Sequence, residues 1–324
     1  MTVLAGSAYY RDMETEGDRS AQPALLTAAR ALVRATRPKQ WSKNLLVYFA
    51  LFFTVAETWD VGDVGSALSL LGKTTTAFVL FSMLSGAVYI VNDIFDVERD
   101  RRHPLKRLRP IASGRLAIPA AWVAGVVLSA SSVGASFVLE PDFGWVALGY
   151  LLTMLTYTVV LKHVVLLDVF AISGGFVLRA VAGAAVLQVP VSPWLYICTG
   201  LGALFIALSK RRSELVLAGE RAGGQRETLD RYTGPLLDQL IAVVAPSTLV
   251  SYTLYTFTAP NLPANHAMML TIPFVVYGLF RYMFLVHTHN MGENPEDILI
   301  TDVPLIACIA LWLVTAAAVL IAWG

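Results

Sequence analysis

Four oxygen-bearing side chains lie close together in the nonapeptide 92–100 (NDIFDVERD). Asp96 lies four residues after Asn92 and three after Asp93. Asp100 follows after another four, so on a helix all of them would share one face. Like charges on one face repel, and a divalent cation among them would relieve this repulsion. Because oxygen ligands suit Mg²⁺, which also binds substrate phosphates, the segment predicts that all four residues hold Mg²⁺ on a pyrophosphate.

The alternative is a solvated helix end whose acids only balance Arg99, Arg101 and Arg102. The position of the acids argues against this, because they directly follow the apolar run 87–91 (AVYIV). Charges that adjoin a membrane span are costly and usually functional.

Basic residues occur near the acids and again later in the chain. Lys106, Arg107 and Arg109 lie in the stretch 101–115, and the pentapeptide 210–214 (KRRSE) follows a later apolar run. Either group alone is as typical of an ordinary basic loop at a membrane surface as of a binding site. Beside Mg²⁺ ligands, phosphate binding is favoured, because Arg pairs with phosphate bidentately and Lys acts as a point charge.

The composition indicates a polytopic membrane protein. The 324 residues are 56% hydrophobic and 15% charged, whereas soluble domains carry about 25% charged residues. A hydrocarbon core of about 30 Å needs about 20 apolar residues per helix. We therefore predict an all-α fold with nine transmembrane helices, near residues 45–58, 74–92, 119–139, 143–161, 165–187, 193–209, 239–258, 266–286 and 303–323.

The basic residues predict the orientation. Most of the 24 Lys and Arg residues fall in segments that nine spans would leave on one side, namely 1–44, 93–118, 162–164, 210–238 and 287–302. Positive charge in short loops marks the cytoplasmic side, so the N-terminus is expected in the cytoplasm and the protein in the plasma membrane.

Two parts of the chain are distinguished by composition. Residues 1–24 are polar and of mixed charge and are predicted to be disordered, which leaves residues 25–324 as one transmembrane domain. At the start of this domain, residues 25–36 have the apolar spacing of an amphipathic helix that lies at the membrane interface.

Two charges lie within the predicted span 165–187. Asp168 and Arg179 are eleven residues apart, so they share a face, but at about 1.5 Å per residue they are too distant to pair. Intramembrane charges mark functional sites by default, with internal pairing as the alternative. We expect both to point into a central cavity. Tyr157 and Lys162 are weaker candidates, because such residues near span ends commonly anchor a helix at the interface.

These motifs resemble the UbiA superfamily of intramembrane prenyltransferases, over residues 37–323. The nonapeptide, followed by Arg109-Pro110 and Ser113-Gly114, is similar to the first Asp-rich signature of the superfamily and the element that trails it. The resemblance implies nine helices around a central cavity, with a cytoplasmic cap made by the loops 93–118 and 210–238.

In most members of the superfamily, a second Asp-rich motif after the sixth span helps to bind a prenyl diphosphate through Mg²⁺. Here the pentapeptide 210–214 takes its place. This pentapeptide and the strings 37–44 (RPKQWSKN) and 168–183 are similar to one actinobacterial branch, the decaprenyl-phosphate phosphoribosyltransferases. The branch transfers ribose 5-phosphate from phosphoribosyl pyrophosphate to a polyprenyl phosphate, for synthesis of cell-wall arabinan.

The residues and the resemblance together predict a donor site and an acceptor site. In the donor site, Asp93, Asp96 and Asp100 are expected to be catalytic and, with Asn92, to hold Mg²⁺. Cations would bind the phosphate of the lipid. The expected substrate-binding residues are Lys43, Asn92, Lys106, Arg107, Arg109, Tyr157, Lys162, Asp168, Arg179, Lys210, Arg211 and Glu214.

Two other functions stay open from the sequence. One is an aromatic-acceptor prenyltransferase that uses a polyprenyl diphosphate, and the other is a non-enzymatic lipid transporter or lipid-binding protein. Membrane lipids are expected partners in each case. No nucleic-acid partner is expected from a chain of net charge +1, and the sequence leaves a homo-oligomer open.

Overall fold

The computed structural model describes residues 24–55, 59, 62–220, 229–260, 262–289, 298 and 301–323. The N-terminal segment predicted to be disordered lies outside these residues, apart from Ala24. Every regular element of the described residues is a helix, which confirms the all-α class. The α-helices are α2 (Ala24–Ala35), α3 (Phe49–Phe53), α4 (Val64–Phe95), α5 (Val97–Arg102), α6 (Ile118–Leu139), α7 (Pro141–Val159), α8 (Leu167–Leu187), α9 (Pro193–Glu220), α10 (Gly234–Thr258), α11 (Ile272–His289) and α13 (Val303–Trp323). The 3₁₀ helices are η2 (Pro38–Tyr48), η3 (Lys106–Leu108), η4 (Leu161–His163), η5 (Leu229–Arg231) and η6 (Ala267–Thr271).

Among the described residues, 7 helices are long and apolar enough to cross a membrane. They are Val64–Phe95, Ile118–Leu139, Leu167–Leu187, Pro193–Leu217, Gly234–Thr258, Ala267–Thr288 and Val303–Trp323. The chain is therefore a multi-pass membrane protein, but nine spans are not confirmed. The expected span 45–58 begins in η2 and continues as the 5-residue α3, so its described part is not one long α-helix. Helix α7 has 19 residues, with Asp142 in its first turn and Thr and Tyr residues near its end.

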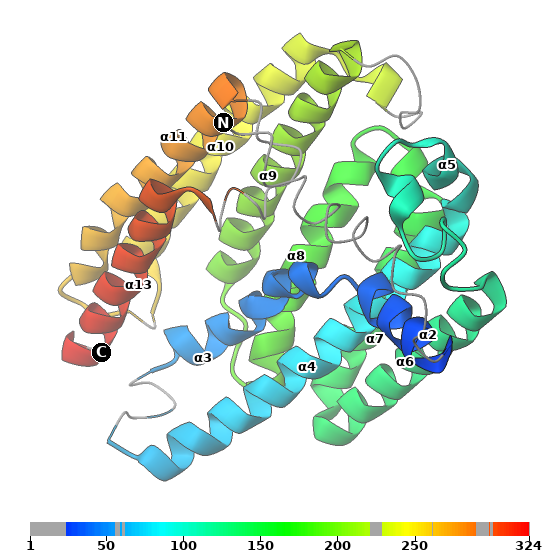
Figure 1. Ribbon diagram of the computed structural model, residues 1–324. Helices are drawn as coiled ribbons and strands as arrows, with labels where there is room; N and C mark the ends of the chain where they lie inside the picture. The colour runs from blue at the N-terminus through cyan, green and yellow to red at the C-terminus, as the bar shows by residue number, and fades with distance from the viewer. Residues whose placement is uncertain are drawn as a thin grey trace.

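The helices pack around α8, which lies between two groups (Figure 1). Helices α4, α6 and α7 lie on one side of it, and α9, α10, α11 and α13 lie on the other. An apolar cluster containing Phe81 and Tyr150 joins α8 to α4 and α7. A second cluster, containing Phe205 and Ile241, joins it to α9 and α10. Helix α8 is therefore packed against other helices on two of its faces.

The two loops that were expected to form a cap differ from each other. The first contains α5, η3 and turns, as its prolines predict, because proline interrupts a helix. The second is shorter than expected, because α9 continues to Glu220. Lys210 and Arg211 consequently belong to a helix and not to a loop, and a helical position gives each side chain a defined direction.

Candidate functional site

The three aspartates lie where α4 ends and α5 begins. Asp93 is in the last turn of α4, Asp96 is the single residue between the helices, and Asp100 is in α5. The Asp100 N–H donates to the Asp96 carbonyl oxygen over 2.8 Å, so the helical turn is kept across the junction. All three residues are buried, which makes their negative charges costly unless cations lie close by.

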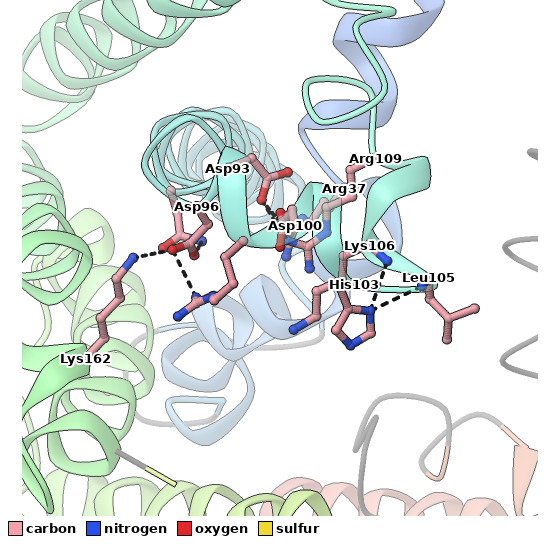
Figure 2. A network of polar contacts seen from close by, with 11 residues as sticks. Arg37, Asp93, Asp96, Asp100, His103, Leu105, Lys106, Arg109 and Lys162 are labelled. Carbon is pink, nitrogen blue, oxygen red and sulfur yellow. Dashed lines mark hydrogen bonds and ion pairs between the residues drawn. The ribbon is translucent and has the colours of Figure 1, made fainter. Parts of the chain in front are cut away.

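One guanidinium joins two of the carboxylates. Arg109 Nη1 lies 3.1 Å from Asp93 Oδ1 and 2.6 Å from Asp100 Oδ2. Arg37, just before η2, also pairs with Asp93 (Figure 2). Arg109 was predicted from the sequence, whereas Arg37 was missed because it lies far from the acids along the chain. A signal was present, since Arg37 begins the string RPKQWSKN.

Asp96 is turned to the other side, toward Lys162 (Figure 2). Its Oδ1 lies 2.8 Å from Lys162 Nζ and 3.0 Å from Arg99 Nη2. Its Oδ2 accepts a hydrogen bond from Asn92 Nδ2 over 3.1 Å. The four predicted ligands therefore form two neighbouring pairs. In the part of the chain that the structure describes, no group of three or more His, Cys, Asp or Glu residues is arranged to hold a metal ion.

Burial raises the pKa of the Asp100 carboxyl above its usual value of 3.8, and the charge of Asp93 raises it further. Arg109 and Lys106 lower it but do not cancel the effect of burial. Lys106 therefore lies close enough to act on Asp100. Arg107, in contrast, is exposed on η3. An additional cation beside these two carboxylates would stabilise their ionised forms.

A cavity of about 870 Å³ lies between η2, α3, α8, α9, α10 and α13. Most of its lining is apolar or aromatic, including Phe53, Tyr252 and Trp312. Its charged lining is cationic, from Lys43, Lys210 and Arg211, and no acidic residue lines it within the described ranges. This combination is suited to an apolar ligand with an anionic end.

Two acids, Asp168 and Glu214, bind the guanidinium of Arg211. Its Nε donates to Asp168 Oδ2 over 2.8 Å, and its Nη1 pairs with Glu214. The hydroxyl of Tyr232, which sequence reasoning missed, donates to Asp168 Oδ1 over 2.7 Å. Tyr157 is close enough to Arg211 to interact with it electrostatically. The structure thus brings Asp168, Arg211 and Glu214 together, but Asp168 does not line the cavity as expected, because its carboxylate is turned to Arg211.

Arg179 does not line this cavity either, contrary to expectation. Its Nε donates to Asn44 Oδ1 and its Nη2 to the Tyr150 hydroxyl, each over 2.8 Å, and its guanidinium lies 4.8 Å from the centre of the Tyr150 ring. Asn44 in turn donates to Ser82 and Ser85 of α4. Arg179 therefore takes part in internal hydrogen bonds, which fix the middle of η2 against α8 and α4.

Helix η2 connects the acids to the cavity. Arg37 at its start pairs with Asp93, and Lys43, six residues later, lines the cavity. A 3₁₀ helix rises about 2 Å per residue, so the two positions are about 12 Å apart along η2. A Cβ on Gly183 of α8 would lie 2.0 Å from the carbonyl oxygen of Val47. Only glycine allows η2 to approach α8 this closely.

The fold and the site define a polytopic helical membrane protein with a charged site beside an apolar cavity. The model of the UbiA prenyltransferase family matches residues 45–294. The chain therefore belongs to the UbiA prenyltransferase family, as the resemblance of its motifs predicted, and it is a transferase.

Relatives and solved structures agree with this assignment. The chain is 34% identical over 296 residues to a decaprenyl-phosphate phosphoribosyltransferase of Mycobacterium tuberculosis strain H37Rv, covering 91% of this chain and 95% of the relative. The corresponding enzyme of Mycolicibacterium smegmatis is 35% identical, with coverages of 89% and 91%. A UbiA homolog from Archaeoglobus fulgidus, solved with GPP and Mg²⁺, has the same fold, with a TM-score of 0.68, 17% identity and coverages of 90% and 99%.

Proposed function

We propose that the protein transfers a 5-phosphoribosyl group from phosphoribosyl pyrophosphate to a polyprenyl phosphate, with Mg²⁺ and with release of pyrophosphate. The product would supply arabinan precursors for the cell wall. The proposal includes the plasma membrane, a cytoplasmic N-terminus and nine spans. The observation that supports it most is the cavity whose charged lining is cationic, which η2 connects to a separate set of buried acids.

The acids are suited to the donor. Mg²⁺ commonly takes only one or two carboxylates and obtains its other ligands from water and substrate phosphates, so it needs no cage of three protein acids. Asp93 and Asp100, which share Arg109, fit this requirement. Asn92 and Asp96, which are hydrogen-bonded to each other, would supply further oxygen ligands nearby. When bound, Mg²⁺ would stabilise the negative charge that the leaving pyrophosphate gains.

The cavity is suited to the acceptor. A polyprenyl phosphate has an apolar tail, and each buried CH₂ contributes about 0.8 kcal/mol. Its single phosphate would meet Lys43, Lys210 and Arg211. A prenyl diphosphate bound through a second metal ion would need acids at this place, where the pentapeptide KRRSE stands instead.

The transfer is a displacement at the anomeric carbon of the ribose. A phosphate oxygen of the lipid attacks this carbon, the bond from the carbon to the pyrophosphate oxygen breaks, and its electrons leave with pyrophosphate. A phosphate monoester is ionised near neutral pH, with a second pKa of about 6, so no strong general base is required. Arg109 and Lys106 would neutralise the leaving group. In-line attack predicts inversion at the anomeric carbon.

The test uses the purified full-length protein in detergent with Mg²⁺. Radiolabelled phosphoribosyl pyrophosphate and a polyprenyl phosphate are expected to give a labelled lipid whose mass corresponds to the phosphoribosylated product. A parallel reaction contains a polyprenyl diphosphate and an aromatic acid. If only the parallel reaction gives a product, the protein is an aromatic prenyltransferase. Lipid binding or flux without any product would instead support a transporter or a lipid-binding protein.

A further inference from the structure

Tyr232 joins the η5–α10 connection to the start of α8 and, through Asp168, to Arg211 of α9. It lies between η5 and α10, and only 3% of it is exposed. Its hydroxyl donates to Asp168 Oδ1 over 2.7 Å and accepts the N–H of Leu166 over 2.8 Å. Asp168 in turn holds Arg211, which lines the cavity. A continuous chain of hydrogen bonds therefore runs from Tyr232 to the cavity wall.

The backbone at the start of α8 supports a role for this contact. Leu166, the N-cap of α8, has φ 68° and ψ −43°, a conformation that residues with a side chain rarely adopt, and its own side chain provides no cap. Such strain persists only where the surroundings enforce it, and it is concentrated at functional sites. The Tyr232 hydroxyl accepts the N–H of this strained residue, which lies two positions before Asp168. The contact therefore fixes the backbone that carries Asp168.

The hydroxyl is also kept in its donor form. Burial, and then the hydrogen bond to Asp168, raise the pKa of Tyr232 above its usual value of 10.0. The phenol therefore stays protonated over the physiological range. Asp168, with no exposed surface, accepts from the phenol on one oxygen and from Arg211 on the other.

Arg211 is the group that this arrangement orients. A guanidinium has five N–H donors in a rigid plane, so fixing two of its nitrogens fixes the directions of all its donors. Asp168 and Glu214 fix Nε and Nη1. The directions of the remaining N–H donors of Arg211 are then fixed as well. Arg211 and its neighbour Lys210 both line the cavity.

We propose that Tyr232 and Asp168 are positioning residues that hold the Arg211 guanidinium toward the phosphate of the lipid acceptor. The inference rests on the proposed function, because the acceptor is taken to be a polyprenyl phosphate. Tyr232, in the η5–α10 connection, would then belong to the acceptor site, and the affinity for the lipid would depend on that connection.

The test measures the dissociation constant of polyprenyl phosphate for the full-length protein in detergent, without donor. Tyr232→Phe is expected to weaken binding about tenfold, because a hydrogen bond to a charged group is lost. The matched control is Tyr282→Phe, since Tyr282 belongs to the same apolar cluster and its ring lies 5.4 Å from that of Phe205. This control is expected to bind the lipid as the wild type does.

A double-mutant cycle separates positioning from simple structural support. If Tyr232 acts through Arg211, Tyr232→Phe adds no further loss of affinity in an Arg211→Lys background. Independent, additive losses, or a lower melting temperature with unchanged lipid affinity, would overturn the inference. Should Tyr232→Phe not fold, Asp168→Asn takes its place in the same cycle. Because no donor is present, the outcome is separate from the transfer assay, where the absence of product would overturn only the proposed function.

Discussion

The α4–α5 junction and the cavity differ in the charge of the residues that they present, which are acids at the junction and cations in the cavity lining. At the junction the acids are buried, and their arginine partners Arg37, Arg99 and Arg109 keep 20 to 31% of their side chains exposed. Lys162, which pairs with Asp96, is the buried exception, with 4% of its side chain exposed. At the cavity both members of the ion pair are buried, since the Arg211 side chain is 2% exposed and Asp168 is fully buried, but only the cation lines the cavity.

This difference indicates how each region meets a phosphate. If the acids hold the donor as proposed, their partly exposed arginine partners would move aside for a metal ion and its phosphates. If Arg211 moved away, the buried charge of Asp168 would lose its cationic partner, which is costly. Arg211 is therefore expected to stay in place and to donate hydrogen bonds to the phosphate of the lipid. On the proposed function, one fold would bind a diphosphate through carboxylates and a monophosphate through cations.

The largest expected effect comes from Asp93→Asn. It removes a charge that would hold Mg²⁺, so kcat/KM for phosphoribosyl transfer should fall on the order of 10²–10³-fold with the melting temperature retained. The matched control is Glu98→Gln, since Glu98 is 71% exposed and pairs with Arg101. Rates of the two variants are compared at saturating lipid. An Asp93→Asn enzyme of normal rate would remove the junction from the donor site.

Replacing Arg211 with Lys should affect the acceptor selectively. Lysine cannot pair with Asp168, Glu214 and a phosphate in one plane, so KM for polyprenyl phosphate should rise about 10–100-fold. KM for the donor should not change. The control is Arg212→Lys, because Arg212 pairs with Asp238 and does not line the cavity. Equal rises in both KM values would show that the two regions are not separate.

A smaller effect is expected from Gly183→Ala, which tests the connection between the regions. Its Cβ would lie 2.0 Å from the Val47 carbonyl oxygen, so η2 must shift, at a cost of about 1–3 kcal/mol. Both KM values should rise, because η2 carries Lys43 and begins beside Arg37. On the same helix, Gly174 has no atom within 4 Å of an added Cβ. Gly174→Ala should therefore keep or raise the melting temperature, and a similar loss in both variants would contradict this role of η2.

Much of the site could be predicted from the sequence where its chemistry is local. The spacing of Asn92, Asp93, Asp96 and Asp100 predicted a group of acids on one face. The structure finds the three aspartates buried at one junction, but Asp96 is turned away from the other two. Arg109 was expected to act on phosphate, and it lies between two of these acids. Short-range periodicity is informative because helix geometry fixes which neighbours share a face.

Contacts between distant segments could not be predicted in this way. Hydropathy predicted a span over residues 45–58, but it does not encode the buried Asn44 that holds η2 to Arg179. It also gave no reason for Asp168 to turn toward Arg211 and Tyr232, which follow it by 43 and 64 residues. Such pairs depend on how helices are placed in three dimensions, and one sequence contains no direct record of that placement.

The separation of a metal-dependent donor site from a metal-independent acceptor site can be measured by binding each substrate with and without Mg²⁺. We expect phosphoribosyl pyrophosphate to bind only with Mg²⁺ and Asp93→Asn to abolish this binding. We expect polyprenyl phosphate to bind equally well in a chelator and more weakly to the Arg211→Lys protein. Lipid binding that requires Mg²⁺, or an Asp93→Asn protein that loses both substrates together, would show that the two sites are not separate.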